Sequence, residues 1–538
     1  MNLRNISANQ IVVWSALFLG LLLSVAIGNA VGSSDMRFVA GVIAILPVAV
    51  IFVKLKTNIW VLLPIGWYLS GRLPWLPVPF TVRDLCFMAV IFFFALFFAT
   101  RALPWRRKLS TLDYLIYMNL FYLATVYVRN PAGFWAMQTS MVGGRPYFEI
   151  ALAFGAFLVL SRVQMSDVLA RILPLFFVIP AWFIGILDVI ARVLPQTASS
   201  LAMLYSGIGG MSGITGAIQQ EARLGETRMT GLQNAGLSSV IALCAKYNPI
   251  TMLSPLHPWR MLLLTLALGA IFLSGFRSTL LFAVVAFFLG VVLRGNIKDL
   301  WIASALTAVV LFALITLQGN VMQLPLTMQR ALSWLPGDWN QEAVADAENS
   351  SQWRFEMWEW AWNDDRILKN KVWGTGFGLS IDDMSLIAAS MMAGQGGANL
   401  LGGSDREQFM ITGTFHSGPL STIKYIGVVG LVLYYLLMCY MAVLAWQLCK
   451  RARGTKAFPL VLFVAIPIIY EPFNFVVVFG ALEGSYPQTL FWAGLLNMAR
   501  RYTDAHPPKP TGVDAPVTRN TNRAGAFREV LVAKRGLA

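Results

Sequence analysis

Charged side chains are scarce in this sequence. Asp, Glu, Lys and Arg make up 12% of the 538 residues, and hydrophobic residues make up 57%, whereas a soluble domain carries roughly 25% charged residues. Apolar runs of about 17–25 residues recur along the chain, which is the length that a helix needs to cross a bilayer. Such a helix satisfies its own backbone hydrogen bonds and is therefore stable in lipid. The composition excludes an ordinary soluble protein and predicts an all-α polytopic integral membrane protein.

Sequence motifs for cofactors and metals are missing as well. The chain has no Walker loop, no Gly-x-Gly-x-x-Gly in a βαβ context and no zinc-binding helix motif. Its four cysteines, Cys86, Cys244, Cys439 and Cys449, form no metal-ligand pair and suggest no disulfide. We therefore expect no metal and no cofactor, and an enzyme driven by a cytoplasmic nucleotide is disfavoured.

The net charge of +15 raises the question of a nucleic-acid partner. The distribution of the basic residues argues against one. Of the 41 Lys and Arg, 25 lie in short connections between alternate apolar runs and in one tail. This is the bias expected of cytoplasmic segments of a membrane protein. It predicts that both termini are cytoplasmic.

We expect about fourteen membrane spans, within a range of 12–14. They lie at residues 11–31, 37–53, 57–71, 82–100, 112–128, 147–161, 172–194, 230–246, 258–275, 278–293, 299–317, 417–447, 457–480 and 484–499.

These spans divide the chain into four parts. Residues 1–317 are predicted to form a helix bundle, 318–416 a large extracytoplasmic loop, 417–499 the last spans and 500–538 a basic cytoplasmic tail without fixed structure. The loop holds 12 of the 26 acidic residues and seven of the 18 tryptophans. A loop of this length is usually functional or disordered, and its aromatic content argues against disorder.

Two local patterns stand out within the loop. Residues 350–368 are predicted to form a helix, because Asn349 followed by Gln352 resembles a capping box. Gly374, Gly376 and Gly378 are then expected to form a turn.

Only three histidines occur in the chain. His257 falls in a cytoplasmic loop and His506 in the tail, so His416 is the one on the outer face. An imidazole titrates near neutral pH and suits a general base. The alternative is that His416 caps or anchors a helix end at the membrane interface.

Arg228, Arg277 and Arg354 are expected on the outer face, against the bias that keeps basic residues in the cytoplasm. A guanidinium group binds phosphate oxygens with two parallel hydrogen bonds. A charge at membrane depth is costly and is often functional. The alternative is that each arginine extends from a span end to the lipid head groups.

The loop tryptophans have two interpretations, and the paired loop acids lack a metal-binding motif. Tryptophan rings stack on sugars, but they also gather at membrane interfaces. The acids Asp364–Asp365 and Asp382–Asp383 are adjacent pairs, without the Asp-x-Asp spacing that nucleotide-sugar enzymes use for metals.

In chain order, four motifs resemble the O-antigen ligase and O-antigen polymerase superfamily. They are Arg228–Gly236 (RMTGLQNAG), Ser274–Thr279 (SGFRST), Arg354–Ala361 (RFEMWEWA) with Gly374–Gly378 (GTGFG), and His416–Leu420 (HSGPL) with Gly427–Leu431 (GVVGL). The resemblance covers roughly residues 225–435. Ser417 stands where the family often has asparagine, and only Asn234 of its common Asn-Pro-Asn is matched, which indicates a distant branch.

The resemblance implies a glycosyltransferase of the bacterial inner membrane. It would move a glycan from an undecaprenyl-pyrophosphate donor to a glycan or lipid acceptor on the periplasmic face, with inversion and without a metal. His416 would be the catalytic base, and Arg228, Arg277 and Arg354 would bind the pyrophosphate. Membrane lipids and other polysaccharide-assembly proteins are further partners that it suggests. Polymerase, ligase and protein glycosylation are not separated, and neither the sugar nor its linkage is identified.

Two alternatives stay open. The first is a transporter or flippase for a lipid-linked or anionic substrate, which needs charges within the membrane; Asp188, Lys424 and Glu471 are candidates. The second is a non-catalytic assembly subunit, in which His416 would be replaceable.

Overall fold

The computed structural model describes most of the chain from residue 55 onward. The described residues are 24, 28, 55–74, 80–99, 109–133, 143–206, 229–318, 323–324, 328–329, 332–333, 335–379, 383–385, 410–413 and 415–507. The expected spans 11–31 and 37–53 therefore lie outside the described residues, apart from Ser24 and Gly28, and so does the tail beyond residue 507.

Helices account for the regular structure of the described residues, and an isolated bridge joins Arg72 to Thr81. This confirms the all-α prediction. The main helices are η2 (Lys56–Val61), α3 (Leu62–Trp67), α4 (Val82–Ala99), α5 (Thr111–Arg129), α6 (Arg145–Leu160), α7 (Asp167–Val193), α8 (Pro195–Leu204), α10 (Thr230–Lys246), α11 (Pro249–Met252), α12 (Pro258–Ser274), α13 (Arg277–Val292), α14 (Ile297–Leu317), α16 (Gln341–Asn363), α19 (Gly418–Ala452), α20 (Phe458–Phe473), η5 (Asn474–Val478) and α21 (Leu482–Ala505).

Every expected span from 57–71 onward corresponds to a helix or to a consecutive pair of helical segments. Among the described helices, five are long and apolar enough to cross a membrane: α4, α7, α14, α19 and the α20–η5 segment. The segment 58–67, α12 and α13 are apolar but shorter. α12 and α13 are short because Gly275, in a left-handed conformation with φ 74°, ends the first helix two residues before the second begins.

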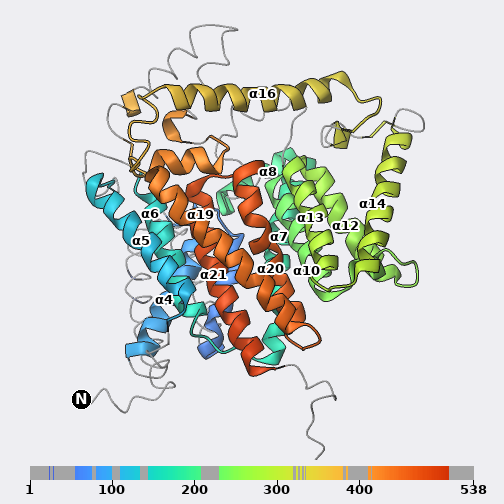
Figure 1. Cartoon of the computed structure of the whole chain (residues 1–538), viewed down its shortest axis with the longest axis horizontal. Coiled ribbons are helices and arrows are strands. Elements are labelled where there is room, and N and C mark those ends of the chain that lie inside the picture. The colour runs from blue at the N-terminus through green and yellow to red at the C-terminus, as the bar shows by residue number, and fades with distance from the viewer. Residues whose placement is uncertain are drawn as a thin grey trace, which may run out of the picture.

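The helices form a bundle with α16 lying across one end of it (Figure 1). We call this the loop end. In Figure 1, α4–α6 lie at one side of the bundle, α10 and α12–α14 lie at the other, and α19–α21 run between them. The centre of the bundle is nearly closed to solvent, because α20 and α21 bury most of their side chains.

The loop helix differs from the prediction. α16 runs from Gln341 to Asn363, so it begins nine residues before the expected helix at 350–368 and ends five residues earlier. The capping-box prediction at Asn349 is wrong, because the helix continues through that residue. The stretch before Asn349 is rich in Ala and Glu, which are strong helix formers, and it extends the helix backward.

α19 is broken at Gly427, which has φ 71° and ψ 177°. This is a backbone region that only glycine adopts readily. The break releases the carbonyls of Lys424 and Tyr425, which accept hydrogen bonds from the amides of Thr375 (2.9 Å) and Gly376 (2.7 Å). On the other side of the break, the amide of Val428 donates to the Lys371 carbonyl (2.8 Å).

The predicted glycine turn therefore docks into the broken helix. Gly374 and Gly376 have φ values of 74° and 77°. A Cβ atom on Gly374 would collide with the backbone of Ile426 and Gly427, and a Cβ atom on Gly427 would collide with the carbonyl of Val372. Irregular backbone at membrane depth persists only where protein pairs its polar groups. Two glycine-containing segments that lie about fifty residues apart thus require each other.

Replacing Gly427 with alanine is expected to destabilise the protein beyond the about 1–3 kcal/mol that such a backbone conformation costs alone, because the Val372 backbone must also move. Gly454→Ala is the matched control, since Gly454 has φ 74° but open space within 4 Å of the position that a Cβ atom would take. Thermal unfolding in detergent, monitored by size-exclusion chromatography, measures the loss of stability in both variants. Equal losses in the two variants would show that docking of the turn contributes nothing.

Candidate functional site

His416 lies at the loop end, directly before α19. Among the described residues, His416 is the only one other than glycine that has a positive φ, at 51°. A left-handed conformation is strained for a residue with a side chain and often occurs at functional positions. The next residue, Ser417, caps the helix, with its hydroxyl accepting a hydrogen bond from the amide of Leu420 (3.5 Å). The helix start therefore fixes the direction in which the imidazole leaves the backbone.

The segment that follows α20 forms one wall beside His416. The ring of Phe479, just after η5, lies 5.1 Å from the imidazole, centroid to centroid. A Cβ atom on Gly480 would collide with the backbone of Gly418, and a Cβ atom on Gly418 would collide with the carbonyl and ring of Phe475. The Ser421 hydroxyl accepts a hydrogen bond from the Leu482 amide (3.1 Å). These contacts hold the start of α19 against the turn between α20 and α21.

The loop helix α16 supplies a second wall. The Trp358 indole Nε1 donates a hydrogen bond to the carbonyl of Phe415 (2.8 Å), the residue before His416. A small apolar core surrounds this bond; it consists of Met357, Ala361, Leu368, Met410, Phe415 and Leu420. Arg354 lies one turn before Trp358 and therefore on the same face of α16. The structure thus brings the Arg354 motif and the His416 motif together.

Arg277 is the first residue of α13, at the same end of the bundle. The carbonyl of Ser274, in the turn before it, accepts a hydrogen bond from the amide of Met229 (3.2 Å). The Gln233 side chain, in α10, donates to the Thr279 hydroxyl (2.7 Å). The first two sequence motifs are therefore adjacent in space. Arg228 lies outside the described residues.

α20 connects the Arg277 region with the His416 region. Phe282, in α13, stacks on Tyr470 of α20 with ring centroids 4.0 Å apart. Phe479, which follows η5 directly, contacts His416. α20 thus links α13, which begins at Arg277, with the segment beside His416, while α16 carries Arg354 and reaches the same segment through Trp358.

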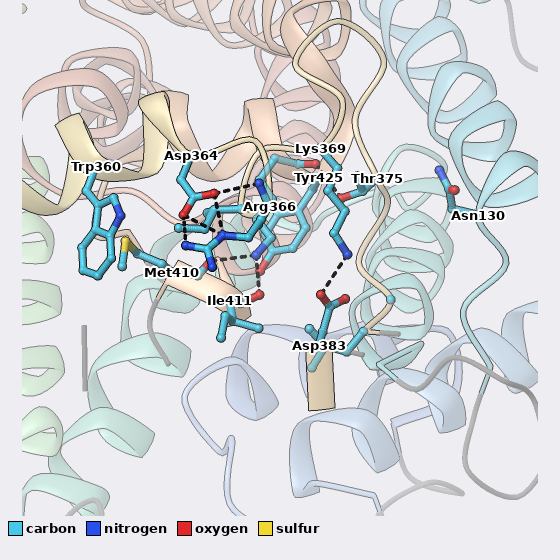
Figure 2. A pocket seen from close by; sticks show the side chains of 14 residues that line it. Asn130, Trp360, Asp364, Arg366, Lys369, Thr375, Asp383, Met410, Ile411 and Tyr425 are labelled. Atoms are coloured by element: carbon cyan, nitrogen blue, oxygen red, sulfur yellow. Dashed lines mark hydrogen bonds and ion pairs between the residues drawn. The ribbon is translucent and has the colours of Figure 1, made fainter. Parts of the chain in front are cut away.

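A cavity of about 230 Å³ lies on the other side of the docked turn. No local pattern in the sequence points to this cavity, because its lining residues come from segments that are far apart in the chain. The lining residues are Asn130, Trp360, Asp364, Arg366, Ile367, Lys369, Thr375, Gly378, Leu379, Asp383, Met410, Ile411, Lys424 and Tyr425. Figure 2 shows Trp360 and Asn130 at opposite ends of the group and the charged side chains between them.

Three acidic residues of the loop form ion pairs with nearby basic side chains. Asp364 contacts Arg366 (2.7 Å), Asp383 contacts Lys369 (3.0 Å) and Asp365 contacts Lys371 (3.1 Å).

The Arg366 guanidinium beside Asp364 lowers the pKa of that carboxyl. Its carboxylate therefore stays ionised at neutral pH. No group of three or more His, Cys, Asp or Glu side chains that could hold a metal ion occurs in the described part of the chain.

The three charges considered for a transporter all have structural contacts. Asp188 is buried in α7 and accepts a hydrogen bond from the Gly231 amide at the start of α10 (2.7 Å), where a helix exposes unpaired N–H groups. The Lys424 ammonium donates to the carbonyls of Met410 (2.7 Å) and Ile411. Glu471, in α20, accepts a hydrogen bond from Asn474 (3.3 Å).

Comparison with known proteins gives one family. The model of the family described as O-antigen ligase matches residues 262–435. The matched range begins in α12 and ends in α19, just past the break at Gly427. It includes Arg277, Arg354 and His416 but not the first motif at residues 228–236. This confirms the predicted resemblance over the matched residues. No curated protein matches the chain.

Replacing Trp358 with phenylalanine keeps an aromatic ring in the small core but removes the donor to the Phe415 carbonyl. We expect the free energy of local opening around His416 to fall by about 1–3 kcal/mol, which is the cost of a buried polar group left unpaired. Hydrogen exchange of the amides of residues 415–418 and of Leu420 measures this change. Trp362→Phe is the control on the same helix, and a similar increase in exchange there would contradict the proposed clamp.

Proposed function

We propose, from the premise that residues 262–435 belong to the O-antigen ligase family, that the protein is a membrane glycosyltransferase. It moves a glycan from an undecaprenyl-pyrophosphate donor to a glycan or lipid acceptor. The observation that carries this proposal is the strained backbone of His416, placed at the loop end of the bundle and clamped by Trp358.

The proposed reaction needs a base and a stabilised leaving group. The acceptor hydroxyl oxygen attacks the anomeric carbon of the donor sugar, and the bond from that carbon to the pyrophosphate oxygen breaks. His416 takes the hydroxyl proton as the new bond forms. A direct displacement of this kind inverts the anomeric configuration. The products are the extended or ligated glycan and undecaprenyl pyrophosphate.

The arginines are proposed to stabilise the negative charge that develops on the pyrophosphate. Guanidinium groups bind phosphate oxygens without any metal. Arg277 begins α13 at the loop end, and Arg354 lies within α16, one turn before Trp358, which supports this role. Arg228 is proposed to join them because Met229, the next residue, contacts the turn that carries Arg277.

Apolar side chains around the end of α20 suit a lipid-linked donor. Phe473, Val476, Val477 and Phe479 are all exposed on the protein surface, and Phe479 also contacts His416. A polyprenyl chain would pack along these side chains and leave its pyrophosphate near the imidazole. The distribution of Lys and Arg supports placing this end on the periplasmic side of the inner membrane.

We expect glycan transfer by purified protein, supplied with a polyprenyl-pyrophosphate glycan and an acceptor in the presence of EDTA. His416→Ala should lower kcat by about 10²–10⁴-fold, the range for loss of a general base. Arg277→Ala and Arg354→Ala should each lower it by about 10²–10³-fold, as for loss of one charge-stabilising donor.

His257→Ala and Arg451→Ala are the controls, since both residues lie at the opposite end of the bundle. Full transfer by His416→Ala would refute the catalytic role of the histidine. No transfer by folded wild-type protein with ligase-type and polymerase-type acceptors would favour the transporter or the assembly subunit instead.

A further inference from the structure

We propose that the cavity beside the docked turn is a carbohydrate subsite, which holds one sugar ring of the glycan that is transferred or of the glycan that receives it. The inference rests on the proposed function. It concerns a cavity that neither His416, Arg277 nor Arg354 lines.

The size of the cavity suits a sugar ring. Its volume of about 230 Å³ is slightly below the roughly 300–1,000 Å³ of sites for drug-sized ligands. Its lining combines apolar side chains with charged ones, whereas an acyl or prenyl chain requires an apolar lining throughout. The charged lining residues are Asp364, Arg366, Lys369, Asp383 and Lys424. A compact ligand with many hydroxyl groups therefore fits best.

The polar lining groups are of the kind that binds sugar hydroxyls. A carboxylate accepts two or more hydrogen bonds, and guanidinium and ammonium groups donate several. Asp364 with Arg366 and Asp383 with Lys369 place such acceptors and donors side by side at the cavity. In Figure 2, Lys369 and Asp383 reach toward each other within the group of lining residues. Each ion pair holds its members in position before a ligand arrives, which lowers the entropy cost of binding.

Trp360 provides a flat apolar surface at one end of the cavity (Figure 2). Its side chain is 39% exposed, although its neighbours Met357 and Ala361 on the same helix are buried. The C–H groups on one face of a pyranose ring pack well on such a surface, while its hydroxyl groups point sideways to the charged groups. An indole beside paired acids and bases is thus a suitable arrangement for one sugar.

The cavity is built on backbone that is held rigidly. Thr375 and Gly378 belong to the turn that docks into the break of α19, and Lys424 and Tyr425 lie just before that break. The Lys424 ammonium also binds the carbonyls of Met410 and Ile411, two further lining residues. A binding site keeps its geometry when its supporting shell is fixed in this way.

The cavity and His416 are connected through Phe415. The Lys424 ammonium, which lines the cavity, lies 5.8 Å from the centre of the Phe415 ring. Met410 also lines the cavity and packs with Phe415 in the small core. The histidine follows Phe415 in the chain. A sugar held in the cavity would therefore position a neighbouring sugar of the same glycan toward His416.

Two matched pairs of variants test the subsite. Asp383→Asn and Trp360→Ala alter the cavity. Asp365→Asn and Trp362→Ala are the controls, because the Asp365–Lys371 pair and the 46% exposed Trp362 lie on the same loop but do not line the cavity. We expect KM for one of the two glycan substrates to rise about tenfold or more in the cavity variants, while kcat changes less and the controls match wild type.

A rise in KM for the lipid-linked glycan alone assigns the sugar to the donor, and a rise for the acceptor alone assigns it to the acceptor. Unchanged KM values for both substrates in active protein would overturn the inference.

A binding measurement separates this inference from the proposed transfer reaction. Saturation-transfer NMR is recorded on the full chain in nanodiscs with methyl glycosides of glucose, galactose, N-acetylglucosamine and glucuronic acid. We expect a signal with wild type and with His416→Ala, and its loss in Asp383→Asn but not in Asp365→Asn. That pattern in a protein without transfer activity would keep the subsite and refute the reaction. No signal from any of the four glycosides with folded wild-type protein would refute the subsite.

Discussion

The backbone hydrogen bonds between the glycine turn and the broken helix α19 are the constraint on which the loop end depends. A break within an apolar helix exposes carbonyl and amide groups that lipid cannot satisfy. Here Thr375, Gly376 and Val428 pair them across two segments, and Tyr122 donates from α5 to the Ile426 carbonyl (2.8 Å). Broken helices in membranes often occur where polar ligands bind, because the freed backbone groups offer polar partners within the bilayer. In this protein those groups pair with the glycine turn.

Two consequences follow from that docking. On one side, it fixes the start of α19, so that the strained His416 is held between Phe479 and the chain segment that Trp358 clamps. On the other side, it closes the cavity lined by Asp364, Asp383 and Trp360. The proposed base and the proposed sugar subsite are thus two faces of one structural unit. A change that loosens the turn should affect both, while a change in either face alone should leave the other intact.

Much of the architecture was predictable because lipid allows few solutions. Every expected span from 57–71 onward appears as helical structure, since an apolar stretch in a bilayer must pair its own backbone. Predictions that depended on one local pattern fared less well. The pair of Asn349 and Gln352 resembled a helix start, but the strong helix formers before it moved the start to Gln341. The glycine turn was predicted, but its partner at Gly427 was not, because the two meet only in the fold.

The sequence by itself determined the all-helical membrane class and the positions of the helices from residue 57 onward, because hydropathy acts locally along the chain. It also carried the O-antigen ligase resemblance, which the family match confirms over residues 262–435. Only the tertiary structure decided which distant residues lie close together. The left-handed backbone of His416, the break that Gly427 makes possible and the cavity beside it all arise from contacts between distant segments, and contacts of that kind have no periodic signature in a sequence.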